Sequence, residues 1–328
     1  MEFTMKIGFI GLGNLGSKLA GSLLRNGVDL MVHDLDKSLM DAFVQRGAAS
    51  AVSPKSLAQH CDAVITCLPS PDVCAHVMES ANGVLAGLSA EKLWLEMSTT
   101  DEAEVRRLAH LAEALGAVPI ECPVSGGCHR AATGNISIFC GGSRAGFELA
   151  LPILAMMGRK ILHTGPLGSA SILKVVTNYL ASVNLVSIGE AFAVAQKSGM
   201  DLTTTFEAIR ISSGNSFVHE TEGQVILNGS YDIGFTLDLV QKDMSLFLDL
   251  AQRAGLPLEV APMVASLFDD AAEKYGSRAL SPRVVQRNEE STGQAFRAPG
   301  FPAELIDDEP EQPGYEVESA RDRGLGGG

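Results

Sequence analysis

The sequence lacks the cysteine and histidine spacings of a metal site. Its six cysteines are Cys61, Cys67, Cys74, Cys122, Cys128 and Cys140. None forms a Cys-x-x-Cys pair, and no histidine lies near them at zinc-like spacing. Several fall in predicted strands, where buried free thiols are common. We therefore expect reduced structural cysteines, no bound metal and a cytoplasmic location, rather than disulfides or a metal centre.

Positive charge is scarce as well. The 328 residues include 25 Lys and Arg against 39 Asp and Glu, a formal net charge of -14. Such a surface repels phosphate groups, which argues against nucleic acid or an anionic membrane as a partner. The first residues run directly into a predicted strand, which leaves no room for a signal peptide. The long uncharged stretch at 175–189 contains several Ser, Thr and Asn residues and is predicted as a buried helix, not a membrane span.

Short apolar runs alternate with amphipathic patterns through the first half of the chain. We predict strands at 6–10, 30–33, 63–68, 93–96, 118–121, 136–140 and 161–163, and helices at 15–26 and 101–115. This alternation indicates an α/β Rossmann-type domain with a doubly wound, mainly parallel sheet. We place that domain at residues 1–166.

The second half has a different pattern. From about residue 169 to 275 the periodicity is helical, with turns at Gly199, 212–214, Gly229 and 255–257. This predicts an all-α C-terminal domain at residues 167–290. The remaining segment, 291–328, is acidic and rich in Pro and Gly, and it is predicted to lack a core of its own.

The run Gly11-Leu12-Gly13-Asn14-Leu15-Gly16 follows the first strand and opens the first helix. Glycines there permit a tight turn and let a pyrophosphate approach unpaired N–H groups at the helix N-terminus. Asp34 ends the second strand, near the spacing of ~20 residues expected for an acid that binds the ribose. Its carboxylate would repel a 2′-phosphate, which favours NAD over NADP. The alternatives are a flavin, another adenine nucleotide, or a turn without a ligand.

Two further segments carry polar chemistry. Consecutive glycines in Ser125-Gly126-Gly127 let backbone N–H groups converge on a carboxylate, although such a run is more often a simple loop. Lys174 and Asn178 are four positions apart and share one helix face. A lysine heading an uncharged stretch is either exposed at a helix end or held in a cleft, where a lowered pKa lets it exchange protons. Its place at the predicted domain junction favours the cleft.

Taken in order, these motifs resemble the β-hydroxyacid dehydrogenase family, which includes 3-hydroxyisobutyrate dehydrogenase and relatives of 6-phosphogluconate dehydrogenase. The resemblance covers residues 5 to about 290. It rests on GLGNLG at 11–16, Leu68-Pro69, Ser98-Thr99, ECPVSGG at 121–127 with Ala131 and Gly134, Lys174 with Asn178, and Lys242-Asp243. It implies a Rossmann domain, an all-α domain that serves substrate binding and oligomerisation, and a homodimer or homotetramer. The implied reaction is NAD-dependent oxidation of a small anionic β-hydroxy acid.

The resemblance also implies roles for single residues. Lys174 would be the catalytic lysine, and Asn178 would help to hold the substrate. The substrate carboxylate would lie on Ser125, Gly126 and Gly127, and Phe235 and Asp243 would line the cleft. The cofactor would be contacted by Gly11, Leu12, Gly13, Asn14, Leu15, Gly16, Asp34, Leu68, Pro69, Thr99 and Lys242. The alternative for Lys242 and Asp243 is a solvated charge pair.

The sequence departs from the family pattern at three places. Ala170 stands where glycine is common, which either narrows the approach to the cleft or has little effect. His129 and Arg130 follow the carboxylate loop, where they either bind a second anionic or polyhydroxylated part of the substrate or point into solvent. The tail after Ser291 exceeds the usual length, and we expect it to cover the cleft or to cross to another subunit.

Other functions fit some of the same residues. A reductase acting on glyoxylate or a semialdehyde would use the same site in reverse, with Lys174 as the proton donor. A non-catalytic NAD-binding sensor would need only the nucleotide loop, so the presence of Lys174, Asn178 and the Ser125–Gly127 loop argues against it. Imine reduction is disfavoured because relatives with that chemistry usually replace the lysine. No metal is required, since a cationic lysine stabilises developing alkoxide charge.

Overall fold

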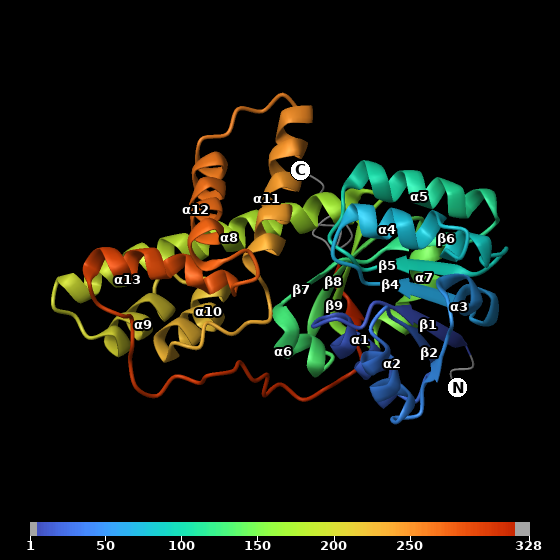
Figure 1. Ribbon diagram of the computed structural model, residues 1–328, viewed down its shortest axis with the longest axis horizontal. Helices are drawn as coiled ribbons and strands as arrows, with labels where there is room; N and C mark the ends of the chain where they lie inside the picture. Colours follow the sequence, from blue (N-terminus) through green and yellow to red (C-terminus); the bar gives the residue numbers. More distant parts are fainter. Residues whose placement is uncertain (1–4, 319–328) are drawn as a thin grey trace. The chain divides into compact units, whose positions relative to one another are not determined.

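The computed structural model describes residues 5–318 and divides the chain into two compact units (Figure 1). Among the described residues, the Rossmann unit comprises 5–174 and 307–318, and the helical unit comprises Val175–Ile306. The division therefore falls inside a helix, a few residues after the boundary predicted at residue 166.

Within the described residues, the Rossmann unit contains one ten-stranded sheet with the strand order β10-β9-β8-β6-β5-β4-β1-β2-β3, and β7 pairs with β8. Strands β1 to β6 are parallel, whereas β8 runs antiparallel to β6 and is followed by β9 and β10 in parallel with it. The order β3-β2-β1-β4-β5-β6 is that of a dinucleotide-binding fold, which confirms the predicted class. The strands are β1 (Lys6–Ile10), β2 (Asp29–His33), β3 (Ala49–Ser50), β4 (Ala63–Thr66), β5 (Leu93–Glu96), β6 (Val118–Glu121), β7 (Val124–Ser125), β8 (Ile136–Gly141), β9 (Gly158–Gly165) and β10 (Tyr315–Glu316).

Helices cover both faces of this sheet, and this is why its strands are apolar on both sides. One core cluster includes Leu19, Phe43 and Phe147, so α1, α2 and α7 pack on one face. A second cluster includes Leu57 and Leu108, which places α3 and α5 on the other face. The helices are α1 (Gly16–Arg25), α2 (Lys37–Val44), α3 (Pro54–His60), α4 (Pro71–Glu79), the 3₁₀ helix η1 (Val84–Ala86), α5 (Glu102–Ala114), α6 (Gly127–Ala132) and α7 (Arg144–Leu154).

The helical unit confirms the prediction of an all-α domain. Its core contains Phe192, Phe206 and Phe268. The long helix α8 is apolar and long enough to cross a membrane by length and composition, but Leu185 and Ile188 of this helix are buried in that core. The elements are α8 (Ser169–Lys197), which begins in the Rossmann unit, α9 (Leu202–Arg210), α10 (Phe217–Asn228), α11 (Leu237–Arg253), α12 (Val260–Tyr275), the 3₁₀ helix η2 (Ser281–Val285) and α13 (Gln286–Thr292).

The described part of the C-terminal segment is divided between the two units. Before Asp307 it packs on the helical unit, where the Phe296 side chain is completely buried and its N–H donates to the Glu289 carboxylate at 2.7 Å. Residues 307–318 pack on the Rossmann unit, where β10 pairs in parallel with β9. The segment is thus held by contacts with the cores of the two units, and it has no core of its own.

Candidate active site

The loop between β1 and α1 is shaped by three glycines with different roles. A Cβ on Gly11, whose φ is +97°, would lie 2.3 Å from the carbonyl oxygen of Cys67. A Cβ on Gly16 would lie 2.0 Å from the carbonyl oxygen of Gly11. Gly13 differs, since a Cβ there would have none of the described atoms within 4 Å. A tightly packed backbone with one open side at a helix N-terminus fits a bound pyrophosphate.

The Asp34 carboxylate is held beside this loop by two backbone hydrogen bonds. The Leu12 N–H donates to Oδ2 at 2.6 Å, and the Asp36 N–H donates to Oδ1 at 2.8 Å. Each carboxylate oxygen retains a second lone pair for another donor. Because Asp34 directly follows β2, it lies where dinucleotide-binding folds place the acid that binds the ribose.

A chain of hydrogen bonds ties together the loops after β4 and β5. The buried Glu96 carboxylate accepts from the Thr66 hydroxyl at 2.8 Å and from the Ser98 N–H at 2.7 Å, and the Ser98 hydroxyl accepts from the Leu68 N–H at 2.8 Å. Burial raises the pKa of Glu96, and its hydrogen bonds oppose this shift. The proposed cofactor contacts Leu68 and Thr99, together with Pro69, thus belong to loops held by one buried carboxylate.

The predicted carboxylate loop follows β6. Ser125 lies in β7 opposite Ser137 of β8, and α6 begins at Gly127. Gly126 and Gly127 have φ values of +129° and +86°. Two successive positive φ values favour glycine, because other residues adopt them only with strain. The local backbone therefore requires both glycines that the motif supplies.

His129 and Arg130 lie in α6, directly after this loop. Burial lowers the pKa of His129, and the neighbouring Arg130 lowers it further, whereas Asp307 acts in the opposite direction. The Arg130 guanidinium lies 3.7 Å from the Glu309 carboxylate. The C-terminal segment therefore supplies an acidic partner that neither of the two sequence-based alternatives included.

Lys174 lies near the start of α8, and its side chain is buried, with only 8% exposed. The helix start is bound by the Glu121 carboxylate, which accepts from the Ala170 N–H at 2.9 Å and from the Ser171 N–H at 3.1 Å. Ala170, where the family often has glycine, is itself fully buried. Asn178 follows one turn after Lys174 on the same helix, as the spacing predicts.

Within the helical unit, Asn178, Lys242 and Asp243 form one polar group. The Asn178 side-chain amide donates to Oδ2 of Asp243, and Lys242 Nζ lies 2.7 Å from Oδ1 of Asp243. The side chains of Lys242 and Asp243 are only 19% and 4% exposed, so this charge pair is not a solvated one. Phe235 precedes α11 and packs, partly buried, against the helical core.

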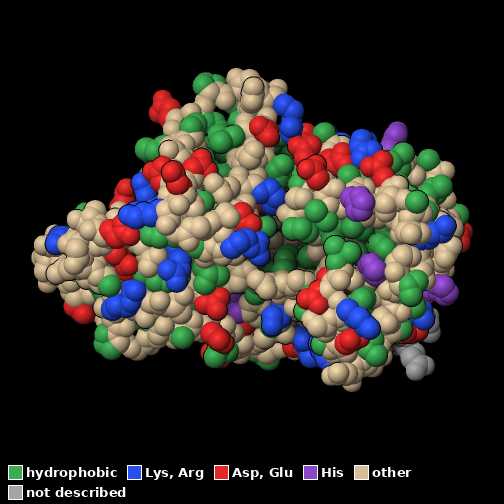
Figure 2. Space-filling view, in the orientation of Figure 1, with side chains coloured by type: hydrophobic (Ala, Val, Ile, Leu, Met, Phe, Trp, Pro, Cys, Tyr) green, Lys and Arg blue, Asp and Glu red, His purple; other side chains and the backbone are tan. Residues whose placement is uncertain are grey.

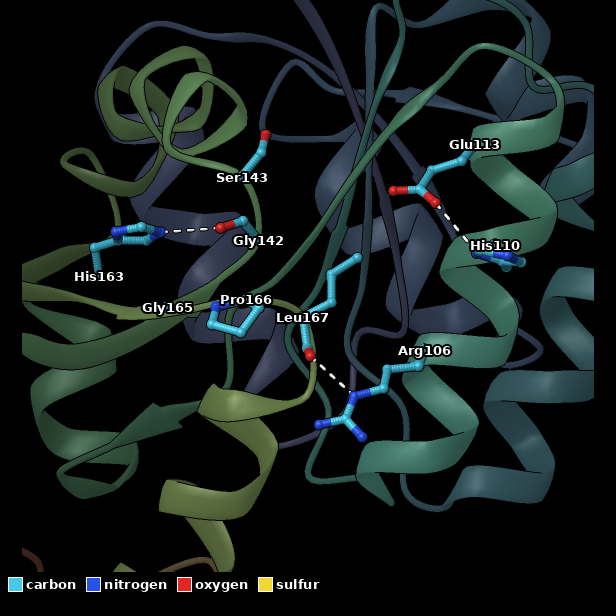
Figure 3. Close-up of a pocket in the computed structure, with 9 residues that line it drawn as sticks. All are labelled: Arg106, His110, Glu113, Gly142, Ser143, His163, Gly165, Pro166 and Leu167. Atoms are coloured by element: carbon cyan, nitrogen blue, oxygen red, sulfur yellow. Dashed lines mark hydrogen bonds and ion pairs between the residues drawn. The ribbon is translucent and has the colours of Figure 1, made fainter.

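The structure also contains a cavity of about 690 Å³ away from these residues. It lies between α5 and the segments after β8 and β9 (Figure 3), and no residue predicted for the site lines it. In Figure 3 Arg106 reaches from α5 toward the loop before α8, where its Nε donates to the Leu167 carbonyl at 3.0 Å. Across residues 5–318 no group of three or more His, Cys, Asp or Glu side chains is arranged to hold a metal ion, and the six cysteines are free.

Comparison with known proteins agrees with this geometry. Residues 6–165 match the NAD binding domain of 6-phosphogluconate dehydrogenase, and residues 168–286 match the NAD-binding region of NADP-dependent 3-hydroxyisobutyrate dehydrogenase. The 2-(hydroxymethyl)glutarate dehydrogenase of Eubacterium barkeri is 32% identical over 294 residues, which cover 89% of this chain and 98% of that protein. The chain belongs to the β-hydroxyacid dehydrogenase family.

Two other β-hydroxyacid dehydrogenases extend the comparison. The NAD-dependent L-serine dehydrogenase of Pseudomonas aeruginosa is 33% identical over 290 residues, covering 86% of this chain and 97% of that protein. The crystal structure of 3-hydroxyisobutyrate dehydrogenase from Salmonella typhimurium matches with a TM-score of 0.79 at 26% identity, covering 86% of this chain and 99% of that one. As a β-hydroxyacid dehydrogenase, the protein is an NAD(P)-dependent enzyme that acts on the hydroxyl group of a hydroxy acid.

Sequence reasoning assigned no role to two carboxylates that organise this β-hydroxyacid dehydrogenase, although Glu121 begins the ECPVSGG motif. Glu96 and Glu121 end the neighbouring strands β5 and β6, lie in register with each other and are each 1% exposed. A signal was available, because each is an acid that closes an otherwise apolar strand. Buried carboxylates need several donors, so such residues indicate hydrogen-bonded loops at a strand end.

Proposed function

We propose that this enzyme oxidises a 3-hydroxypropanoate that carries a substituent at carbon 2, with NAD as the hydride acceptor. The observation that carries the proposal is Lys174, a buried lysine near the start of α8, in the same unit as the Ser125–Gly127 loop. Relatives are named for 3-hydroxyisobutyrate, L-serine and 2-(hydroxymethyl)glutarate. These three compounds share a primary alcohol one carbon away from the carbon that bears the carboxylate.

The chain's own residues divide the work of this reaction. Backbone N–H groups at Ser125, Gly126 and Gly127 hold the substrate carboxylate. Lys174, neutral before the reaction, accepts the hydroxyl proton, and the resulting ammonium stabilises developing negative charge on the oxygen. Asn178 orients the hydroxyl or the lysine. Bound NAD supplies the acceptor for the hydride that leaves the carbinol carbon.

Local donors are needed because the surface as a whole does not attract anions. Figure 2 shows acidic and basic side chains interspersed over the visible face, and acidic residues exceed basic ones across the chain. The Ser125–Gly127 loop and the N-terminus of α1 supply such donors from the backbone. The Asp34 carboxylate supports our proposal of NAD over NADP, because it would repel a 2′-phosphate.

The function is tested by NAD reduction with 3-hydroxyisobutyrate, serine, threonate, glycerate and sulfonated analogues. Lys174→Ala should lower turnover of the accepted substrate by roughly 100-fold or more, the range that general acid–base catalysis supplies. NADH binding, followed by fluorescence, should remain nearly unchanged. Lys197→Ala, at the exposed end of the same helix, is the matched control. Near-normal turnover by Lys174→Ala would refute the lysine's role.

We also propose a cytoplasmic homodimer or homotetramer. The helical unit exposes large apolar side chains, including Leu180 at 53%, Val194 at 67% and Met263 at 60%. Apolar surface of this kind is typical of subunit interfaces. Six free thiols are consistent with a reducing compartment. Light scattering that gives the mass of a single chain at micromolar concentration would contradict the oligomer.

A further inference from the structure

Glu121 connects the two segments to which the proposed function assigns chemistry. It ends β6 and lies four residues before Ser125, where the carboxylate loop begins. Its carboxylate also receives the donors at the start of α8: the Ala170 N–H at 2.9 Å, the Ser171 N–H at 3.1 Å, and the Ser171 hydroxyl.

The site around this carboxylate is closely fitted. A Cβ on Gly141, the residue of β8 opposite Glu121, would lie 2.2 Å from Glu121 Oε1. The glycine therefore leaves the space that the carboxylate occupies. The Glu121 side chain is buried, so its interactions with α8 are shielded from water. An ionised carboxylate only accepts hydrogen bonds, and the start of α8 presents three donors to Glu121. Burial raises the pKa of Glu121, and these hydrogen bonds oppose the shift.

The other side of the same junction is held by α5. Arg106 Nε donates to the carbonyl of Leu167, and a Cβ on Gly168, whose φ is +92°, would lie 2.4 Å from that Nε. Arg106 thus binds the carbonyl of Leu167 just before α8, and Glu121 binds the N–H groups of Ala170 and Ser171 in its first turn. Lys174 follows Ser171 by three residues, about one helical turn. Its Cα position is set by this fixed first turn.

We propose that Glu121 is a positioning residue for Lys174, binding the first turn of α8 so that the lysine is held in register with the carboxylate loop. This inference rests on the proposed function. Gln at this position keeps one acceptor but presents an amide N–H toward the helix N–H groups. Since both are donors, the first turn must move or lose a hydrogen bond.

A double-mutant cycle separates positioning from a purely structural role. Glu121→Gln should lower kcat by about 10-fold or more, within the ~100-fold that a 1 Å misplacement can cost. In the Lys174→Ala background the same change should cost less than about 2-fold, because the residue it positions is absent. The dissociation constant of NADH should stay within about 2-fold in every variant, since the nucleotide loop is untouched.

Glu289→Gln is the matched control. Glu289 is a buried carboxylate of the helical unit that accepts from Tyr231, Phe296 and Arg297, and it has no role in the proposed chemistry. Its variant should lose thermal stability without loss of kcat. Amide hydrogen exchange at Ala170 and Ser171 should become faster in Glu121→Gln and stay unchanged in Glu289→Gln.

Each outcome bears on one claim. Equal costs of Glu121→Gln in the two backgrounds, or unchanged exchange at the start of α8, would overturn the positioning role while leaving the proposed function intact. Normal turnover by Lys174→Ala would overturn the catalytic role of the lysine, and with it any action of Glu121 through that residue. An inactive Lys174→Ala with a fully active Glu121→Gln would overturn the positioning role alone.

Discussion

Replacing Asp34 by alanine should reverse much of the preference between NAD and NADP. The carboxylate already accepts one backbone N–H on each oxygen, from Leu12 and from Asp36. One lone pair on each oxygen remains, enough for the two ribose hydroxyls. The structure thus predicts two charge-assisted hydrogen bonds to NAD and repulsion of the phosphate that NADP carries at the same place.

The expected loss of NAD binding free energy follows from these two hydrogen bonds. Hydrogen bonds to charged groups contribute about 1.5–3 kcal/mol each, which sets an upper bound of about 3–6 kcal/mol. Asp34 is only half-buried, so water replaces part of the lost bonding, and we expect about 2–3 kcal/mol. That corresponds to a roughly 30- to 150-fold weaker binding of NAD. Asp34→Ala also removes the hydrogen bond from the Leu12 N–H, but this loss weakens NAD and NADP binding alike. The ratio of the two affinities therefore reports only the interaction of the carboxylate with the ribose and its substituent.

The assay is titration of NADH and NADPH fluorescence with Asp34→Ala and the parent protein. Asp36→Ala is the control, because Asp36 lies two residues away and caps α2 by accepting from Ser38. We expect the NAD:NADP affinity ratio to fall by at least about 30-fold in Asp34→Ala and to stay constant in Asp36→Ala. An NAD:NADP affinity ratio in Asp34→Ala within about 3-fold of the parent value would show that the Asp34 carboxylate does not bind the ribose hydroxyls.

Three other predictions concern single contacts. Glu96→Gln should raise the KM for NAD with little change in the KM for the hydroxy acid, because Glu96 holds the loops expected to contact the cofactor. Steady-state kinetics measures both constants, and equal increases in the two KM values would contradict a role of Glu96 in cofactor binding. Asp307→Ala removes the hydrogen bonds that Thr133 and Asn135, directly after α6, donate to the Asp307 carboxylate. Because α6 follows the Ser125–Gly127 loop, this change should raise the KM for the hydroxy acid several-fold. Glu316→Ala, farther along the same segment, is the control and should leave that KM unchanged. Burial raises the pKa of Glu222 from 4.5 to about 8, so the folded state favours its protonated form and loses stability as pH rises from 4.5 to 8. Glu222→Gln should therefore raise the melting temperature more above pH 8 than below pH 4.5. Equal changes in melting temperature in the two pH ranges would disprove the raised pKa of Glu222.

Local sequence patterns were sufficient for most of the Rossmann sheet. Apolar runs gave β1, β5 and β6 at their observed positions, because each strand is buried on both faces. Short helices such as α2, α3 and α7 were not predicted, although each starts at a side chain that caps it: Asp36, Ser53 and Ser143. Helices α2 and α3 have only 8 and 7 residues, about two turns each, which leaves little periodicity to detect. Helix α7 has 11 residues, so its cap at Ser143 was a signal that sequence reasoning did not use.

By itself, the sequence determined the fold class, the glycine-rich turn between β1 and α1, the glycines at 126 and 127, and the placement of Lys174 and Asn178 one turn apart on a helix. These features depend on local backbone conformation or on the spacing along one helix, and both are determined by residues that are close together in the sequence. Only the tertiary structure decided that Glu121 binds the start of α8 and that Asp307 and Glu309 bind Thr133, Asn135 and Arg130. Those partners are at least 49 residues apart in the chain, and the Thr133–Asp307 pair is 174 residues apart. No local pattern encodes which distant donor a buried carboxylate will meet, because that choice depends on how whole strands and helices pack.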